Sequence, residues 1–554
     1  MSYSAYKTLP ERHIRILDLG AGAPLSPLRG SLRSISLDAV PEYEALSYTW
    51  GASTSTAALD CGGALLPLTL NLQLALARLR RLQHVRTLWI DQICINQNDV
   101  LERGQQVGLM GEIYRKARKV SIWLGEEDEH TEDVRLYLIP ELLACCEKSK
   151  LEDDTRDPQP LVIEHLGLPY LNSPNWAAFR NIFHRPFFRR MLIVQEVVLG
   201  VECMVLIGSI EFRWDDIAEA SFCLRHDVDR AIEAHQYVSL IRRLKTTSAS
   251  LQDKSLLTLL GQSYQLLCTN PLDKVFGILG IASDIQSGDL VPDYSLTCRQ
   301  VFSNAARLII SKYQPLSLLY YVKFPKSIQG LPSWVPDWTA VSPSREILAL
   351  GNESRIDSVQ GLGDTMPSRI LATYWVPDGP YLRVLKNWER LSLRVMPYFT
   401  GEAHITLFWR VLIADGNTLG DESDKDREEM FKSWYGGFIE NGFINEQPFG
   451  LEYWVKPHIA THNERALEFW TLFGGVSEGR RMITTTEGFI GLGPADALEG
   501  DHICFFPGLS VPILLRLTPS EGKFRLIGEW YLQGWMNGRQ SGVIKDRSEE
   551  IVII

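Results

Sequence analysis

A short apolar run that ends abruptly in polar residues constrains the fold of this chain more than any other feature. Leu88-Trp89-Ile90 is followed directly by Asp91 and Gln92, and Asn96 comes soon after. A buried parallel strand delivers polar side chains in this way to the open end of a sheet, where α/β proteins gather their ligands. The segment therefore predicts a functional sheet edge. A well-packed strand followed by a polar turn is the structural alternative.

The residues around this run alternate between strand and helix patterns. Asp99 and Glu102 have the spacing of a capping box at the start of a further helix, in which apolar residues recur at helical intervals. Earlier and later segments give three strands and one helix: Tyr43–Tyr48, Val85–Asp91 and Lys119–Leu124, and Asn71–Arg81. This order predicts an α/β N-terminal domain with a mainly parallel sheet flanked by helices.

The chain is too long for a single hydrophobic core, since it has 554 residues. We expect the α/β domain to occupy residues 1–200 and a helical accessory region to occupy 201–340. Residues 341–379, rich in Gly, Ser, Asp and Pro, predict a linker or variable surface, and 380–479 a mainly helical region. Short β runs separated by Gly or Pro turns predict a small β-rich C-terminal module over 480–554.

Composition narrows the classes of function. The net charge of −11 disfavours nucleic acid as a partner, because phosphate recognition depends on clustered Lys and Arg. Nine cysteines without a CxxC pair give no zinc site, so no metal is expected. No apolar run reaches the ~18 residues of a membrane span. We therefore expect a cytoplasmic protein without a membrane span.

Four long segments, in the same order along the chain, resemble the heterokaryon incompatibility (HET) domain of filamentous fungi. They are YEALSYTWG at 43–51, LWIDQICINQ at 88–97, QVGLMGEIYRKARKVSIWLG at 106–125 and RPFFRRMLIVQEVVLG at 185–200. Later segments such as DKVFGILGIA, VPDYS and LPSWVPDW resemble the regions that accompany this domain. The resemblance implies non-self recognition, with growth arrest or regulated cell death when incompatible cells fuse, and an incompatibility partner whose identity the sequence does not give.

The order of the predicted elements is also similar to the TIR fold, whose enzymatic members cleave NAD with one glutamate on a helix. In that comparison Glu196 holds the position of the catalytic acid. The likeness is at the level of the fold, so it gives an expectation of activity and no proof. NAD would be a substrate, and no cofactor is expected. The chain is thus a candidate NAD glycohydrolase.

Nearby polar and aromatic residues would then assist the reaction. A carboxylate close to the ribose can stabilise the positive charge that develops when the nicotinamide bond breaks. An indole can stack on a ring, amides and carboxylates can bond ribose hydroxyls, and guanidinium groups bind phosphate in a fork. The candidate substrate-binding residues are Trp50, Asp91, Gln92, Asn96, Arg189 and Arg190.

Each candidate also has a structural interpretation. Glu196 can form a salt bridge with a neighbouring arginine or favour a helix start. Trp50 can be a core aromatic residue. Asp91 can cap a turn, and Asn96 can satisfy loop backbone. Cys94 is not favoured as a nucleophile, because no histidine follows nearby.

A second hypothesis requires no chemistry. The domain would act as a signalling or scaffold module that triggers death or arrest through protein–protein interaction, and the Trp- and Tyr-rich accessory region would receive a partner. Self-association fits both hypotheses, although no interface can be identified from the sequence. Fingerprints of dinucleotide-binding oxidoreductases, serine hydrolases, zinc proteases and P-loop NTPases are missing from the sequence.

Overall fold

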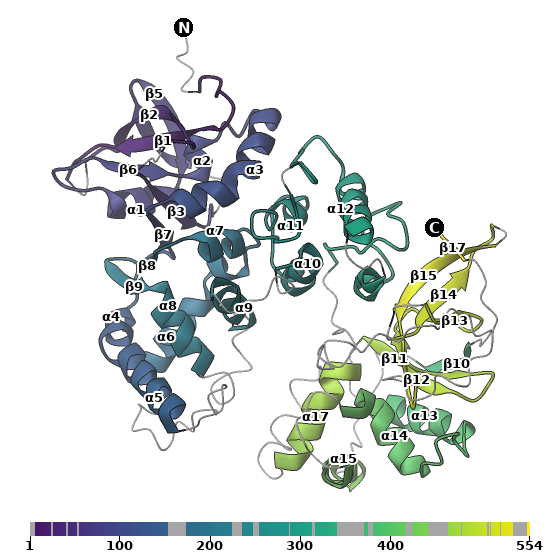
Figure 1. Ribbon diagram of the computed structural model, residues 1–554. Helices are drawn as coiled ribbons and strands as arrows, with labels where there is room; N and C mark the ends of the chain where they lie inside the picture. The colour runs from purple at the N-terminus through teal and green to yellow at the C-terminus, as the bar shows by residue number, and fades with distance from the viewer. Residues whose placement is uncertain are drawn as a thin grey trace. The chain divides into compact units, whose positions relative to one another are not determined.

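A mixed nine-stranded sheet forms the framework of the N-terminal part of this computed structural model (Figure 1). The strand order is β5-β4-β2-β1-β6-β3-β7-β8-β9. The strands are β1 (His13–Leu19), β2 (Arg29–Ser36), β3 (Glu44–Tyr48), β4 (Ser55–Cys61), β5 (Ala64–Thr69), β6 (Arg86–Trp89), β7 (Lys119–Trp123), β8 (Cys203–Ile207) and β9 (Ile210–Arg213).

The chain divides into two units, Met1–Val301 and Phe302–Ile554. The structure describes residues 6–23, 26–39, 42–51, 55–152, 173–223, 235–246, 254–286, 288–312, 316–340, 370–374, 381–416, 424–440, 464–477, 479–506, 509, 511–520, 522–535 and 551–554. Most of the expected linker at 341–379 therefore lies outside the described residues.

Parallel pairing is confined mainly to the centre of the sheet. The neighbours β6, β3, β7 and β8 run parallel, whereas β1 pairs antiparallel with both β2 and β6, and β9 pairs antiparallel with β8. All five residues of β3 are buried, as expected of a central strand covered on both faces. The sheet is thus mixed, and the expectation of a mainly parallel sheet was wrong.

The strands predicted near 43–48, 85–91 and 119–124 are present as β3, β6 and β7. The sequence patterns did not predict β1, β2, β4, β5, β8 or β9. Much of β2 is exposed, so it lacks a strong apolar signal. β8 and β9 place the end of the sheet at Arg213, beyond the boundary of 200 that was expected, because they follow α7 directly and form an antiparallel pair.

Helices accompany the sheet and continue beyond it. Those of the first unit are α1 (Leu70–Leu79), α2 (Asp91–Cys94), α3 (Val100–Lys116), α4 (Thr131–Asp133), α5 (Ile139–Glu152), α6 (Pro174–His184), α7 (Ile193–Leu199), α8 (Trp214–Cys223), α9 (His235–Lys245), α10 (Leu256–Ser263) and α11 (Asp273–Phe276); α12 (Cys298–Lys312) spans the boundary between the units. Leu72, Leu76 and Leu79 of α1 join a core with residues of β1, β3 and β6. Amphipathic α1 thus covers part of the sheet, as its leucine pattern predicted.

The start of α3 confirms half of the predicted capping box. The Asp99 carboxylate accepts hydrogen bonds from the backbone N–H groups of Leu101 and Glu102, both at 3.0 Å. The Glu102 side chain does not return to Asp99, whose backbone N–H donates to the carbonyl of Asn96. Glu102 instead bonds the backbone N–H of Asn96 and the side chain of Arg15. The Glu102 carboxylate therefore pairs with a buried arginine and does not form the second bond of the capping box.

Glycines let the accessory segment lie against the helices of the sheet domain. A Cβ added at Gly280 would lie 2.8 Å from Cα of Gly111 on α3 and 2.5 Å from Oε1 of Gln195 on α7. A Cβ at Gly104, also on α3, would lie 2.6 Å from the carbonyl oxygen of Pro292. The DKVFGILGIA and VPDYS segments therefore pack against the helices that carry the HET-like motifs.

We expect Gly280→Ala to destabilise the N-terminal unit by about 1–3 kcal/mol, because a backbone atom blocks the new methyl group. Differential scanning calorimetry of the full chain should show a lower Tm for this unit. Gly474→Ala is the matched control, since Gly474 lies in a helix with nothing within 4 Å of an added Cβ. The control should be neutral or stabilising. Equal Tm values for the wild type and Gly280→Ala would contradict the close approach.

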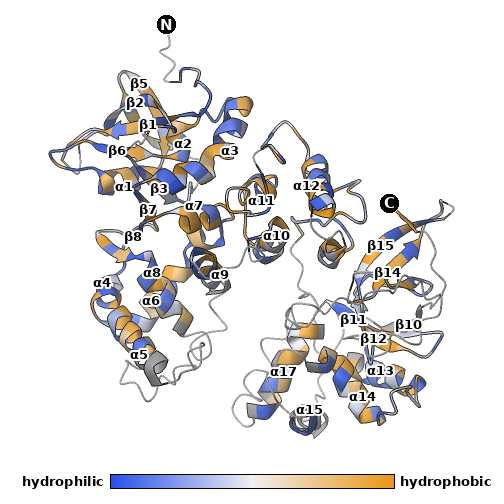
Figure 2. Ribbon diagram, in the orientation of Figure 1, coloured by the Kyte–Doolittle hydropathy of each residue, from blue (hydrophilic) through white to orange (hydrophobic). Residues whose placement is uncertain are grey.

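The second unit combines a helical part with two four-stranded sheets, ordered β10-β11-β12-β16 and β13-β14-β15-β17. Its helices carry both apolar and polar residues (Figure 2), and buried Trp409, Trp434 and Phe469 lie in their shared core. The elements are β10 (Ile370–Tyr374), α13 (Tyr381–Arg394), α14 (His404–Leu412), α15 (Asp424–Glu440), α17 (Glu464–Ser477), β11 (Arg480–Thr485), β12 (Ile490–Pro494), β13 (His502–Cys504), β14 (Ile513–Leu517), β15 (Lys523–Glu529), β16 (Tyr531–Leu532) and β17 (Val552–Ile553).

A helical part and a small β-rich C-terminal module agree with the fold class expected from the sequence. β10 is a correction, because it lies inside the predicted linker and pairs antiparallel with β11. A strand of five residues surrounded by Gly, Ser, Asp and Pro gives little periodic signal. Among the described residues, no helix is long and apolar enough to cross a membrane.

Candidate functional site

The carboxyl ends of β3 and β6 bring the candidate residues toward α7. β3 ends at Tyr48, two residues before Trp50, and β6 leads into α2, whose first residue is Asp91. The two strands are parallel neighbours, so their ends meet at one edge of the sheet. Glu196 lies in α7 and forms a hydrogen bond with Ser47 of β3. The predicted sheet edge and the predicted acid therefore meet.

Glu196 is a buried acid held by hydroxyl groups. Its side chain is 2% exposed, and Ser47 Oγ donates a hydrogen bond to its Oε2. Burial raises the pKa of Glu196 to about 7, while Arg190 and the hydrogen bonds from Ser47 and Tyr114 oppose the increase. The carboxyl group is thus poised between its two protonation states at neutral pH, a property that is common at functional sites.

Asp91 is the second buried acid of the group. Trp50 Nε1 donates to Asp91 Oδ2 at 2.8 Å, and the backbone N–H of Gln92 donates to Asp91 Oδ1 at 2.7 Å. Burial raises the pKa of Asp91, and Arg190 opposes the increase. Trp50 remains 38% exposed, so its ring is not a core residue. It is the most exposed of the contacts to Asp91.

Arg190 is the cation shared by both acids. Its guanidinium donates to the backbone carbonyl oxygen of Tyr48. Its positive charge opposes the increase in the pKa of both Glu196 and Asp91. Its backbone forms a parallel bridge with Leu267, and the N–H of Met191 donates to the carbonyl of Leu267 at 2.8 Å. A segment beyond residue 200 therefore holds the cation in place.

Of the remaining predicted residues, one belongs to this group and the others do not. Gln92 joins it, because Tyr48 donates its hydroxyl to Gln92 Oε1 at 2.8 Å. Arg189 is exposed at the end of a 3-10 helix, and its carbonyl accepts from Leu267 N–H at 2.5 Å. Asn96 Oδ1 accepts from the backbone N–H of Asn98 at 3.3 Å, which is the structural role considered for it. The structure thus joins Trp50, Asp91, Gln92, Arg190 and Glu196 in one group, in which the two acids are buried, and Asn96 belongs to another.

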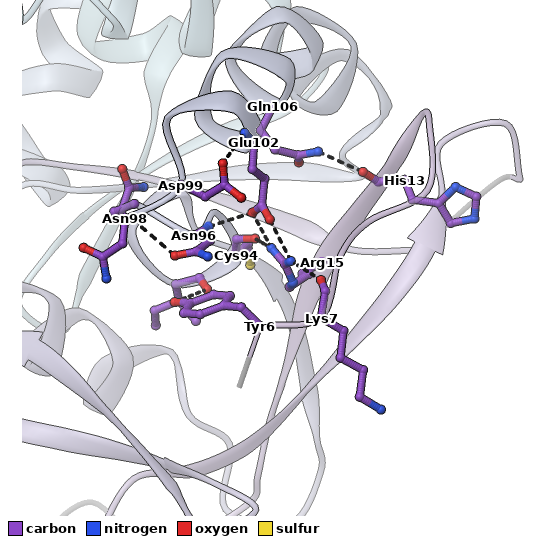
Figure 3. Close-up of polar contacts among 12 residues, drawn as sticks. Tyr6, Lys7, His13, Arg15, Cys94, Asn96, Asn98, Asp99, Glu102 and Gln106 are labelled. Atoms are coloured by element: carbon purple, nitrogen blue, oxygen red, sulfur yellow. Dashed lines mark hydrogen bonds and ion pairs between the residues drawn. The ribbon is translucent and has the colours of Figure 1, made fainter. Parts of the chain in front are cut away.

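That other group is a buried ion pair that holds the loop after β6 (Figure 3). Arg15 on β1 donates to both carboxylate oxygens of Glu102 at 2.5 and 2.9 Å, and both side chains are buried. Glu102 also accepts from Asn96 N–H at 2.7 Å, and Arg15 donates to the carbonyl of Cys94 at 3.2 Å. The pair therefore connects β1 and α3 to α2 and to the residues that follow it, as far as Asn96.

The N-terminal segment contributes to the same ion-pair network (Figure 3). Tyr6 donates its hydroxyl to the carbonyl of Ile93 at 3.1 Å, and Arg15 donates to the carbonyl of Lys7. The Arg15 guanidinium lies 5.0 Å from the centroid of the Tyr6 ring. Two carbonyls of the segment 91–94 are thus bound by side chains that precede residue 16.

Sequence reasoning missed several residues of the first group. Ser47, Tyr48 and Tyr114 contact or surround Glu196, yet Ser47 and Tyr48 had been placed only within a predicted strand, and none of the three was a candidate site residue. The available signal was Ser47 itself, a hydroxyl inside an otherwise buried strand, which requires a polar partner. Burial raises the pKa of Cys94 to about 12, as expected for an inert thiol.

The pKa of Glu196 predicts a pH dependence of stability. The folded protein holds the Glu196 proton up to about pH 7, whereas the unfolded chain releases it near 4.5. Unfolding is therefore favoured increasingly as pH rises between these values, and Glu196 should cost about 3 kcal/mol of stability above pH 7. Denaturation of the wild type and Glu196→Gln from pH 5 to 8 would measure this. A constant difference between the two proteins would exclude the raised pKa.

Among the residues that the structure describes, no group of three or more His, Cys, Asp or Glu side chains could hold a metal ion. The chemical groups available at the site are therefore two acids, one guanidinium, amide and hydroxyl groups, and an indole. Such a set can bind a cation beside its carboxylates and an anion beside its guanidinium.

Comparisons with known proteins add to the geometry. Residues 43–196 match the family described as heterokaryon incompatibility protein (HET), and residues 457–552 match the Het-6 β-barrel domain. The chain is 27% identical to heterokaryon incompatibility protein 6, OR allele, of Neurospora crassa, over 96% of this chain and 94% of that protein. No solved structure matches the chain. The likeness to the TIR fold is therefore not confirmed.

Proposed function

We propose that this chain is a heterokaryon incompatibility protein that acts in fungal non-self recognition and in the growth arrest or regulated cell death that follows. Within that role, the N-terminal domain cleaves NAD between nicotinamide and ribose. The observation that carries the proposal is the grouping of Glu196, Asp91 and Arg190 beside a partly exposed Trp50.

The reaction needs few protein groups. The bond between the nicotinamide nitrogen and C1 of the ribose breaks, and its electron pair stays on the nitrogen, so that the cationic ring leaves as a neutral molecule. Water adds to C1 and releases one proton, which gives ADP-ribose. The carboxylate of Glu196 stabilises the positive charge that develops on the sugar. No acid is required to protonate the leaving group.

The charges of the group match the two ends of this substrate. The cationic ring and ribose lie against Glu196 and Asp91, where a positive charge favours the ionised acids and lowers the pKa of Glu196. Arg190 binds the diphosphate, and Trp50 stacks on a ring. In the free protein, the two acids interact with Arg190. A bound dinucleotide thus replaces this interaction by its own contacts with the acids and with the arginine.

The proposal requires an opened form of the site, because Glu196 is 2% exposed. Trp50 is the exposed partner of Asp91, so its displacement would uncover that acid first. Closure around the bound substrate would then exclude bulk water, apart from the molecule that adds to C1. The dependence on an opened form fits an activity that is triggered only when incompatible cells fuse.

The direct test is release of nicotinamide by the full chain at high protein concentration. NAD should yield nicotinamide and ADP-ribose in equal amounts, measured by chromatography. Reduced NADH is the control and should remain intact, because its neutral ring is a poor leaving group. Failure to release nicotinamide from NAD at any protein concentration, from a chain that still kills cells on expression, would refute the enzymatic proposal.

The burial of Glu196 favours a second candidate function, a non-catalytic module that signals through protein–protein interaction. In that case the contacts among Ser47, Tyr114 and Glu196 serve only to stabilise the fold. Cellular NAD separates the two functions. It should fall before viability is lost if the domain is an enzyme, and it should remain constant until cells die if the domain is a scaffold.

A further inference from the structure

Ser47 links the central sheet directly to Glu196. It is the fourth residue of β3 and is 1% exposed. Its hydroxyl donates a hydrogen bond to Oε2 of Glu196, which lies on α7, 149 residues further along the chain. This bond joins β3, which lies next to the middle strand β6, to the helix that carries the acid.

The surroundings of Ser47 make this contact informative. The other residues of β3 include the apolar Ala45, Leu46 and Tyr48, all buried. A hydroxyl at such a position costs free energy unless it has a partner, and an alanine or valine would pack there without that requirement. A serine whose partner is a carboxylate therefore indicates a role in holding that carboxylate.

We propose that Ser47 is a positioning residue for Glu196, fixing the direction of its carboxylate and favouring its ionised form. This inference rests on the proposed NAD cleavage, in which the ionised acid faces the ribose. A hydroxyl that donates to one carboxylate oxygen restricts rotation of the group and leaves the other oxygen to face the sugar. Ser47 itself touches no substrate.

Other groups around Glu196 act on its charge at the same time. Arg190 favours the ionised form, Asp91 favours the protonated form, and Tyr114 on α3 forms a hydrogen bond with the acid. On α9, the amino group of Lys245 binds the carbonyl of Gly200 at 2.5 Å, at the end of α7. Ser47 is separable from these groups, because removing its hydroxyl changes no charge.

The experiment compares Ser47→Ala and Ser47→Thr with the wild type in the full chain. The carboxyl ¹³C resonance of Glu196, assigned by its loss in Glu196→Gln, is followed through a pH titration. In Ser47→Ala the titration should move to higher pH, and nicotinamide release at neutral pH should fall about tenfold or more and recover as pH rises. Ser47→Thr keeps the hydroxyl and should restore both properties.

Ser121→Ala is the matched control, since Ser121 is fully buried on the neighbouring strand β7 and its hydroxyl faces Arg86 at 3.5 Å. It should leave the titration of Glu196 unchanged. If Ser47→Ala does not fold, Ser47→Cys provides a weaker donor of similar size and should shift the titration in the same direction.

The two readouts separate this inference from the proposed function. An unchanged titration in Ser47→Ala or Ser47→Cys would overturn the role of Ser47, whatever the activity. A shifted titration in a protein that never releases nicotinamide would support the role of Ser47 as a positioning residue for Glu196. It would also refute the proposed reaction. A loss of activity equal at all pH values, without a shift, would also overturn the inference.

Discussion

Glu196→Gln should reduce nicotinamide release by about a thousandfold, the scale of a single group that stabilises charge in a transition state. Glutamine has nearly the same shape and can accept the bond from Ser47, but it carries no charge to stabilise the ribosyl cation. Steady-state kinetics with NAD would measure the loss as a decrease in kcat.

The fold should survive this substitution, because the acid is already close to half protonated at neutral pH in its buried position. Glu202→Gln is a suitable control, since Glu202 is exposed, lies six residues away, and changes the net charge equally. The control should keep full activity. Normal turnover by Glu196→Gln would remove this residue from the mechanism, even if NAD hydrolysis itself is real.

Glu102→Ala should destabilise the N-terminal unit by about 3–5 kcal/mol. The substitution leaves the guanidinium of Arg15 buried without its charged partner, and an uncompensated buried charge is among the most costly changes a protein can undergo. Calorimetry should show a lower Tm for this unit. The loop from Asp91 to Asn96 should also open, because Glu102 binds Asn96 N–H and Arg15 binds the Cys94 carbonyl. Hydrogen exchange would reveal that opening.

A double variant distinguishes the cost of a lone charge from the value of the pair. Arg15→Met with Glu102→Met replaces both groups by apolar ones and should recover most of the lost stability. Asp38→Ala removes a partner of exposed Arg12 and should have little measurable effect. A loss from Glu102→Ala as small as that from Asp38→Ala would contradict the buried ion pair.

The sequence predicted the central elements of the N-terminal fold. β3, β6, β7, α1 and α3 each have a strong local pattern, either a dense apolar run or a helical stripe with an N-cap. Such patterns depend on residues close in sequence, which is why they could be recognised in a single chain. The likeness of the predicted element order to the TIR fold singled out Glu196, and the structure places it near Asp91 and Arg190.

The missed features all depend on partners that are distant in sequence. Arg15 and Glu102 are 87 residues apart, and nothing in either local segment indicates their pairing. Ser47 and Glu196 are 149 residues apart. Asn96 was assigned to the substrate because it follows a strand end, yet its side-chain oxygen accepts from the backbone N–H of Asn98, and its own backbone N–H donates to the Glu102 carboxylate. Proximity in sequence to Asp91 did not imply proximity to Glu196.

The backbone pairing of Arg190 and Met191 with Leu267 has an evolutionary consequence. The match to the heterokaryon incompatibility family ends at residue 196, yet Arg190 within it pairs with a main-chain partner, Leu267, that lies well beyond that end. Recombination between alleles with a breakpoint near residue 230 would combine an arginine from one parent with a partner from the other. We expect viable hybrids to have their junctions after residue 301, so that this unit is inherited whole.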